Sequence, residues 1–274
     1  MNGAKMRTKP NRAYQVDDDP SPHRLPPRLQ GWEWLLSLAA FVAIWQLVST
    51  LLAVPSYILP SPALTIGAIA RDAGLLGQHL AATLAATMSG LTLAVFAGLL
   101  VAILMNGSRV IGEIIYSHMV LSQAVPLIAI APVILIWFGL GLFAKTIIVA
   151  AVCFFPIAVN TYEGFRTVRS EHIYLLTTFG ATRWQRYIHL FLPATLPGIF
   201  AGLKIAATYS VLGAVVGEWL GGVRGMGIYM TRALQSFRTD KLFAAIFVVM
   251  LTSYFIFKGV SVVGDWLTPW SKGR

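Results

Sequence analysis

The sequence predicts an all-α, polytopic membrane protein. Hydrophobic residues make up 57% of the 274 residues and charged residues only 12%, against roughly 25% charged residues in an average soluble domain. Stretches 34–70, 73–108 and 114–144 contain no Asp, Glu, Lys or Arg, and each exceeds the roughly 20 residues that a helix needs to cross a bilayer. The alternating pattern of a membrane β-barrel is missing throughout. A helix bundle is the remaining way to satisfy backbone groups in lipid.

Further apolar runs bring the expected number of spanning helices to about six. The predicted crossings lie near residues 33–53, 82–105, 117–138, 146–162, 196–218 and 242–264. Together they form one transmembrane domain, residues 32–268. Residues 1–31 contain five prolines and three consecutive aspartates, which predicts a disordered tail. They lack the apolar core of a secretory signal, and residues 269–274 form a second, short tail.

Breakers and small residues organise the spans. After the first span, three prolines end the helix, and Ser61 can cap a new interfacial helix over 63–71 that starts at Pro62. In the second span small residues recur at every fourth position, as they do at Gly213, Gly217 and Gly221 in the fifth. This spacing predicts close helix packing. The stripe of the second span consists of Ala82, Ala86, Gly90, Ala94, Gly98 and Ala102.

Prolines also lie inside two spans, Pro126 and Pro132 in the third and Pro156 in the fourth. A proline frees a backbone carbonyl that neighbours or water must satisfy. Interrupted helices are common where a solute path crosses a bundle. The same prolines can be simple kinks, and the sequence leaves both interpretations open.

The net charge of +10 is first a topology signal, because Lys and Arg concentrate on the cytoplasmic side of membrane proteins. With a cytoplasmic N-terminus, thirteen of the 21 Lys and Arg residues fall in cytoplasmic segments, six fall outside, and Lys204 and Lys258 lie within spans. This orientation places both termini in the cytoplasm and requires no nucleic acid as a partner. Segment 221–241 holds four of the outside charges, and its length and glycines predict a partly re-entrant or folded external segment.

Motifs of catalysis and metal binding are absent from the sequence. Residues 139–146, GLGLFAKT, resemble a phosphate-binding loop. However, Ala144 replaces its second glycine, and the run joins two apolar helices instead of following a strand, so we reject a nucleotide site. The lone Cys153 excludes an intrachain disulfide, and its apolar surroundings predict a buried side chain. We expect no catalytic residue, metal or cofactor on this chain.

Two charges lie well inside apolar runs, Lys204 and Glu218. A charge at mid-bilayer costs roughly 2.5 to 3.5 kcal/mol. Each lies near an end of the fifth span, so snorkelling to the interface can explain both, and we favour it for Lys204. Glu218, between Gly217 and Trp219, can instead face a cavity and line or gate a path. One intramembrane acid gives little support to a proton relay.

A basic amphipathic insert, residues 171–193, separates the fourth and fifth spans. It carries Arg183 and Arg186 among aromatic residues, is divided by Gly180 and ends at Pro193. This pattern predicts two short helices joined by a turn. On the cytoplasmic side, such an insert is suited to docking a partner protein.

The spacing within this insert resembles the loop signature of membrane permease subunits of binding-protein-dependent ATP-binding-cassette importers. Gly180-Ala181 and Leu192-Pro193 match that signature, whereas residues 174–176 depart from its leading Glu-x-Ala. The resemblance covers about residues 32–270. Further motifs look like the nitrate, sulfonate and taurine branch, namely Leu59-Pro60-Ser61-Pro62, Val125-Pro126-Leu127, Ile136-Trp137-Phe138-Gly139 and Phe155-Pro156-Ile157 with Asn160-Thr161. Residues 203–210 and 213–221 look most like permeases for pyrimidine precursors of thiamine, with riboflavin importers next.

The resemblance implies an inner-membrane homodimer that works with two copies of a cytoplasmic ATPase and an extracytoplasmic substrate-binding protein. ATP and Mg would be bound by the ATPase. Residues 163–195 would form the ATPase-coupling loop, with Gly180, Ala181, Arg183, Arg186, Leu192 and Pro193 as its main residues. Candidates for the translocation path are Glu218, Trp219, Asn160 and Pro156.

The expected function is therefore an importer permease for a small organic or anionic solute. A pyrimidine precursor of thiamine is the first expectation, with nitrate, sulfonate, taurine or riboflavin as alternatives. Two rivals remain, an ion-coupled transporter or channel that works alone and a membrane-embedded enzyme. The first normally offers several intramembrane acids, and the second lacks its motifs.

Overall fold

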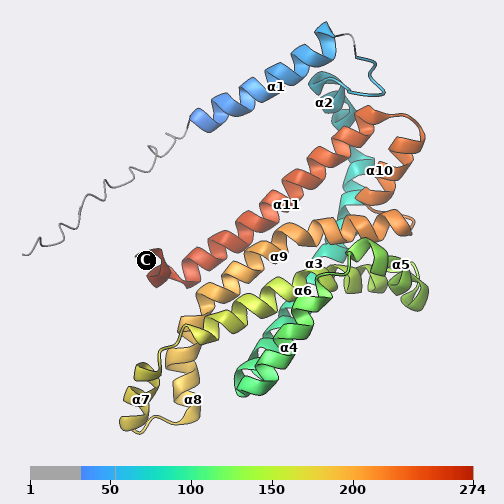
Figure 1. Ribbon diagram of the computed structural model, residues 1–274. Helices are drawn as coiled ribbons and strands as arrows, with labels where there is room; N and C mark the ends of the chain where they lie inside the picture. The colour runs from blue at the N-terminus through green and yellow to red at the C-terminus, as the bar shows by residue number, and fades with distance from the viewer. Residues whose placement is uncertain (1–31, 53, 274) are drawn as a thin grey trace, which may run out of the picture. The chain divides into compact units, whose positions relative to one another are not determined.

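Every regular element in the described residues, 32–52 and 54–273 of this computed structural model, is a helix (Figure 1). The all-α prediction is confirmed. Contacts divide the chain into two units, Met1–Ile44 and Trp45–Arg274. The division falls within α1 (Glu33–Leu51), and the following description concerns the second unit. The tail predicted for residues 1–31 lies outside the described residues.

Helices of very different lengths follow one another along the second unit. They are α2 (Pro62–Arg71), α3 (Ala73–Gly107), α4 (Arg109–Ser122), α5 (Leu127–Phe138), α6 (Leu142–Arg166), α7 (Ser170–Thr178), α8 (Arg183–Arg186), a π-helical turn (Tyr187–Phe191), α9 (Leu192–Leu220), α10 (Met226–Gln235), α11 (Thr239–Leu267) and a 3₁₀ turn (Pro269–Gly273). In the described residues, four continuous helical stretches are long and apolar enough to span a membrane. They are α3, α6, Arg183–Leu220 and α11.

The pair α4 and α5 can supply a fifth span, although the two helices meet at 97°. The crossing predicted near 117–138 is therefore broken in the middle, and one of the interruptions that its prolines predicted is found here. Pro126 explains the break, because it has no N–H to donate and it disfavours helical geometry at the residue before it. The apolar part of α1 is Leu35–Leu51, and the count of six spans stays a prediction.

The short helix predicted after the first span is confirmed as α2. The Ser61 hydroxyl accepts a hydrogen bond from the Leu64 N–H at 3.3 Å, and Pro62 occupies the first turn. Both residues suit a helix start, where backbone N–H groups have no partner within the helix. Trp45, at the other side of this connection, donates to the Pro60 carbonyl at 3.0 Å.

The core of the second unit is formed by α3, α6 and α9, with α6 packed between the other two. The small-residue stripe of α3 lies against α6, as predicted. A Cβ on Gly98 would lie only 2.9 Å from the Ile157 side chain. The predicted burial of Cys153 is also confirmed, since its Sγ lies 3.3 Å from the Ala206 carbonyl oxygen of α9.

Glycines of α9 bring its backbone against α6. A Cβ on Gly202 would lie 2.5 Å from the Pro156 carbonyl oxygen and 3.1 Å from the Asn160 Cβ. Gly213 faces Val149 of α6 in the same way, with 3.3 Å between its hypothetical Cβ and the Val149 Cα. These contacts leave no room for larger side chains, so the glycines set the distance between the two helices.

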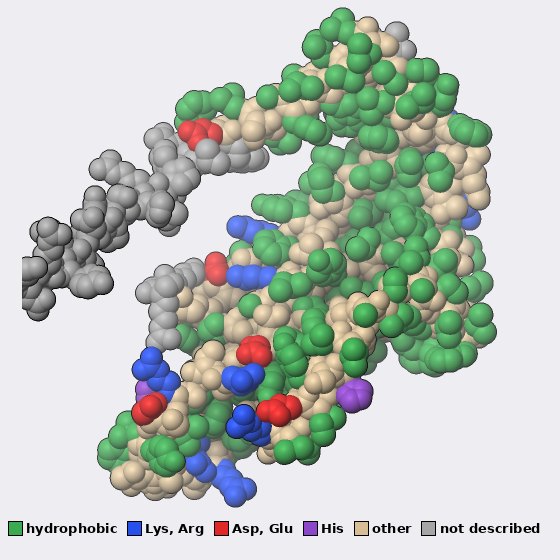
Figure 2. Space-filling view, viewed as in Figure 1, with side chains coloured by type: hydrophobic (Ala, Val, Ile, Leu, Met, Phe, Trp, Pro, Cys, Tyr) green, Lys and Arg blue, Asp and Glu red, His purple; other side chains and the backbone are tan. Residues whose placement is uncertain are grey.

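Hydrophobic side chains cover most of the visible face of the long helices, and charged side chains gather towards the end that carries α7 and α8 (Figure 2). This distribution suits a lipid-facing middle and a water-facing end.

Candidate coupling hairpin and polar clusters

The segment 171–193 forms two short helices joined by a turn at Gly180, as predicted. Gly180 has φ +74°, a left-handed conformation that favours glycine. Its N–H donates to the Thr177 carbonyl at 3.0 Å, and the Ala181 N–H donates to the Leu176 carbonyl at 3.0 Å. This pair of bonds is a Schellman motif. Gly180 and Ala181 therefore end α7 and set the direction of the chain into α8.

A capping box starts α8. The Thr182 hydroxyl accepts from the Gln185 N–H at 3.3 Å, and the Thr182 N–H donates to Gln185 Oε1 at 2.8 Å. Arg186 links the two helices, because its guanidinium donates to the Thr177 hydroxyl at 3.2 Å. Local hydrogen bonds thus define the turn without a buried core. We call this unit, residues 170–191, the hairpin.

The hairpin continues into α9 without a break. The π-helical turn Tyr187–Phe191 is followed directly by Leu192 and Pro193 in the first turn of α9. Pro193 thus lies inside a continuous helical stretch, where it has no N–H to donate to the preceding turn. Sequence reasoning placed Pro193 correctly but missed the π turn. In the first turn of α9, the buried Thr195 packs against Gly164 of α6. This contact joins the end of the hairpin to the core.

Large side chains of the hairpin are exposed. Tyr174 is 74% exposed, Phe179 is 79% exposed and Trp184 is 73% exposed, and no residue of α7, α8 or the π turn is buried. Arg183 is exposed and Arg186 is half-buried. Rigid aromatic side chains beside arginines are typical of protein interfaces. The hairpin can therefore seat in a groove of a partner.

A buried polar cluster lies at the opposite end of α9. Glu218 is fully buried, and Thr83 of α3 donates to its carboxylate at 2.9 Å. The Gly227 N–H donates to the same carboxylate at 2.9 Å, and the Met226 N–H donates to the Thr83 hydroxyl at 2.8 Å. Glu218 and Thr83 therefore accept hydrogen bonds from the first N–H groups of α10, which have no acceptor within the helix.

Backbone geometry makes room for this cluster. Gly225 has φ +139° and lies directly against the Glu218 carboxylate, which any Cβ at this position would overlap. His79 Nδ1 lies 2.7 Å from the Gly225 carbonyl oxygen. Lys145, also buried, donates to the Arg224 carbonyl at 3.1 Å. Lys145, which belongs to the run 139–146 that resembles a phosphate-binding loop, thus holds segment 221–225 to α6.

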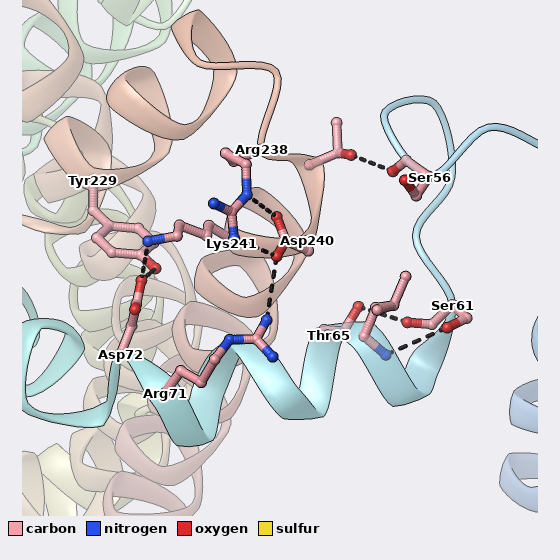
Figure 3. A network of polar contacts seen from close by, with 11 residues as sticks. Ser56, Ser61, Thr65, Arg71, Asp72, Tyr229, Arg238, Asp240 and Lys241 are labelled. Carbon is pink, nitrogen blue, oxygen red and sulfur yellow. Dashed lines mark hydrogen bonds and ion pairs between the residues drawn. The ribbon is translucent and has the colours of Figure 1, made fainter.

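A second, more exposed network ties α10 to α2 and α11 (Figure 3). Asp72 accepts a hydrogen bond from the Tyr229 hydroxyl at 2.8 Å and forms an ion pair with Lys241 at 2.7 Å. Arg238 binds Asp240 at 3.0 Å. The hydrogen bond from Lys241 lowers the pKa of Asp72, whereas burial, followed by the bond to Asp72, raises the pKa of Tyr229. Segment 221–241, expected to be partly re-entrant or folded, contains the helix α10, and its external location stays a prediction.

The structure separates the four candidate path residues. Pro156 and Asn160 lie one turn apart on α6 and line one cavity of about 350 Å³. Trp219 lines a different, mainly apolar hollow of about 370 Å³ between α9, α10 and α11. Glu218 does not face a cavity as the sequence suggested, because its carboxylate is fully buried by Thr83 and residues 225–227.

Lys204 has a partner that sequence reasoning missed. Its Nζ lies 3.7 Å from a carboxylate oxygen of Asp265 on α11. The lysine side chain is 31% exposed. Its charge is therefore balanced by the Asp265 carboxylate, in addition to any snorkelling towards the interface. The two residues are 61 positions apart, and their pairing depends on how α9 and α11 pack.

These features define a helical membrane protein with an exposed helical hairpin at one end of its bundle and, at the other end, a helical segment held by polar contacts. The chain belongs to the family of binding-protein-dependent transport system inner membrane components, whose sequence profile matches residues 90–270. It is thus an inner-membrane component of a transport system that depends on a substrate-binding protein.

Three relatives align over most of the chain. The formylaminopyrimidine transport permease protein ThiX of Halalkalibacterium halodurans is 36% identical over 89% of this chain and 97% of its own. The riboflavin transport system permease protein RibX of Chloroflexus aurantiacus is 34% identical over 90% and 96%. The taurine transport system permease protein TauC of Escherichia coli is 30% identical over 90% and 96%. The family and branch expected from the sequence motifs are confirmed.

Proposed function

We propose that this chain is the permease subunit of an ATP-driven importer and that the hairpin couples it to a cytoplasmic ATPase. The observation that carries the proposal is the hairpin itself, which exposes Tyr174, Phe179 and Trp184 while its turn is fixed by Gly180. Because the hairpin passes into α9 without a break, a displacement at the ATPase is transmitted along about 44 Å of helix.

Partners follow from this function. Two copies of the chain, two ATPase subunits and one extracytoplasmic substrate-binding protein would form the working complex in the lipid bilayer. ATP and Mg would be bound by the ATPase subunits, and this chain would bind no cofactor or metal. ATP binding would close the ATPases and move the hairpins with them, which shifts the bundle between outward and inward access.

The hairpin lies in the cytoplasm in this proposal, and segment 221–241 lies outside. Figure 1 shows α7 and α8 at one end of α9 and α10 at the other, which supports placing them on opposite membrane faces. Glu218, on α9, then holds α10 in place through its hydrogen bond from the Gly227 N–H. Pro156 and Asn160 line the path in this proposal, whereas Trp219 faces the separate hollow between α9, α10 and α11.

The transported solute is a small organic molecule in this proposal, with a pyrimidine precursor of thiamine as the first choice. The 36% sequence identity to ThiX supports the pyrimidine, and the similarity to the riboflavin and taurine permeases defines the alternatives. An ion-coupled transporter that works alone finds less support, because the buried Glu218 is engaged by hydrogen bonds that hold α10.

The test is purification of the chain with its genomic neighbours. The chain should co-purify with an ATPase, and the complex should hydrolyse ATP in a vanadate-sensitive manner that a loaded binding protein stimulates. A solitary chain that transports solute at full rate without an ATPase would refute the proposal. The shift in melting temperature of the neighbouring binding protein with candidate solutes would identify the substrate.

A further inference from the structure

One cavity of the bundle combines helix irregularities with hydrogen-bonding side chains. It has a volume of about 350 Å³, within the range of about 300 to 1,000 Å³ found for small-molecule sites. Its walls come from the break between α4 and α5, from α6 and from α9. The lining residues are Gln123, Val152, Phe155, Pro156, Asn160, Ile205 and Tyr209.

The break between α4 and α5 and the proline inside α6 meet at the cavity. Gln123 lies at the 97° break between α4 and α5, and Pro156 interrupts the hydrogen bonding of α6. A Cβ on Gly202 of α9 would lie 2.5 Å from the Pro156 carbonyl oxygen, so the two helices pack closely beside this proline. Discontinuous helices are where membrane transporters form binding sites, because their backbone is free of regular hydrogen bonding there.

The polar groups of the cavity are neutral. Asn160 Nδ2 donates to the Pro156 carbonyl at 2.7 Å, so the Asn160 Oδ1 is left to accept a hydrogen bond. The Gln123 amide and the Tyr209 hydroxyl can each donate and accept. Phe155 and Tyr209 contribute aromatic rings, and Tyr209 is 47% exposed. No Lys, Arg, His, Asp or Glu is among the residues that line the cavity.

This composition discriminates between classes of solute. An anion in a low-dielectric bundle needs a cation or several N–H donors to offset the loss of hydration. An uncharged ring with ring nitrogens and amino groups needs a few neutral donors and acceptors and an aromatic surface to stack on. The cavity supplies the second set.

We propose that this cavity is a solute-contact site of the translocation path and that it accepts an uncharged, planar nitrogen heterocycle. The Asn160 side-chain oxygen Oδ1 accepts from an exocyclic amino group of the solute. Gln123 and Tyr209 bind its remaining polar edge, and Phe155 packs against the ring. The proposal rests on the importer function proposed above, and it selects an uncharged aminopyrimidine over a solute that carries a charged sulfonate group within the branch.

The test uses the complete complex, with its ATPase and binding protein, in proteoliposomes. Radiolabelled formylaminopyrimidine and taurine are the two probes. Wild-type complex should take up the pyrimidine with ATP. Asn160→Asp, which turns a neutral acceptor into a charge, should lower pyrimidine uptake at least tenfold, and Tyr209→Phe should lower it about fivefold, the effect of one net hydrogen bond. Gln78→Glu, at an exposed position of α3 outside the cavity, is the matched control and should transport normally.

The outcomes separate the two proposals. If wild-type complex shows no ATP-dependent uptake of any solute that its binding protein holds, the importer function fails and the cavity proposal fails with it. If wild type takes up the pyrimidine and both cavity variants do so at the wild-type rate, only the cavity proposal is overturned. Preferential uptake of taurine by wild type would overturn the assigned solute class. Tyr209→Phe removes a single exposed oxygen, so it remains informative if Asn160→Asp fails to assemble.

Discussion

Replacing Gly180 tests the hairpin at its turn. Its φ of +74° costs an L-residue roughly 1–2 kcal/mol, and no atom lies within 4 Å of the position a Cβ would take. The effect of a substitution is therefore backbone strain without a steric clash. A loss of 1–2 kcal/mol reduces the population of the native turn relative to competing conformations by a factor of about 5 to 30.

The expected result is a graded loss of ATPase binding. Gly180→Ala should weaken the affinity of the permease for its ATPase by up to about fivefold, and Gly180→Val should weaken it further, towards 30-fold. Gly180→Asn should stay near wild type, because Asn tolerates the left-handed conformation. Insertion of the permease into the membrane should be unchanged in all three variants, since α7 and α8 bury no residue.

The measurement is a titration of the purified ATPase against permease in lipid nanodiscs. Equal affinity of Gly180→Val and wild type would refute the role assigned to the turn. A loss in Gly180→Asn as large as in Gly180→Val would also contradict the reasoning, because it would point to side-chain size at the interface instead of backbone conformation.

Three further predictions concern the bundle and its other end. Glu218→Gln replaces an oxygen of the carboxylate that accepts from the Gly227 N–H and the Thr83 hydroxyl, and it should raise amide hydrogen exchange across 222–235 by a factor that reflects about 1–3 kcal/mol; unchanged protection would show that the carboxylate does not hold α10. Asp72 has a lowered pKa, so its stabilisation is complete above about pH 4 and is lost as the pH falls through the lowered value. The thermal midpoint of Asp72→Asn should therefore lie below that of wild type at pH 7 and approach it at pH 2, and a pH-independent difference would contradict this assignment. Gly202→Ala places a Cβ 2.5 Å from a carbonyl oxygen and should lower stability by about 1–3 kcal/mol, whereas Gly74→Ala, with open space around it, should not; equal thermal midpoints for the two variants would argue against close α6–α9 packing.

Local signals in the sequence predicted the hairpin well. A glycine in the middle of an amphipathic insert predicts a turn, and Leu192-Pro193 predicts the start of the next helix, because each depends on the conformations open to one or two residues. The structure confirms both. The π turn between them has no comparable local signal.

Features that depend on tertiary packing could not be predicted. Glu218 looked suited to a cavity because it lies in an apolar run, but its partners Thr83 and Gly227 are fixed by how α3 and α10 pack around α9. The pairing of Lys204 with Asp265 depends on the same kind of information. Periodicity identifies a helix face and does not identify the element that covers it.

The bend at Pro126 shows a limit of hydropathy. Residues 117–138 contain no Asp, Glu, Lys or Arg, and the pair α4 and α5 passes as one span by composition, yet the helices on either side of the proline diverge by 97°. The prolines at 126 and 156 are chemically alike, but Pro156 remains inside a continuous α6. Contacts with α3 and α9 on both sides of α6 hold that helix straight enough to continue, whereas α4 and α5 have fewer neighbours.

The most direct test of the central claim is site-specific photocrosslinking at two phenylalanines of nearly equal exposure. Phe179 in the hairpin is 79% exposed, and Phe237, in the turn before α11 at the other end of the bundle, is 76% exposed. With benzoylphenylalanine at either position in intact cells, Phe179 should capture the ATPase subunit and Phe237 should not. Capture of the ATPase from Phe237, or no capture from Phe179 in cells that import the solute, would contradict the assignment of the hairpin as the coupling element.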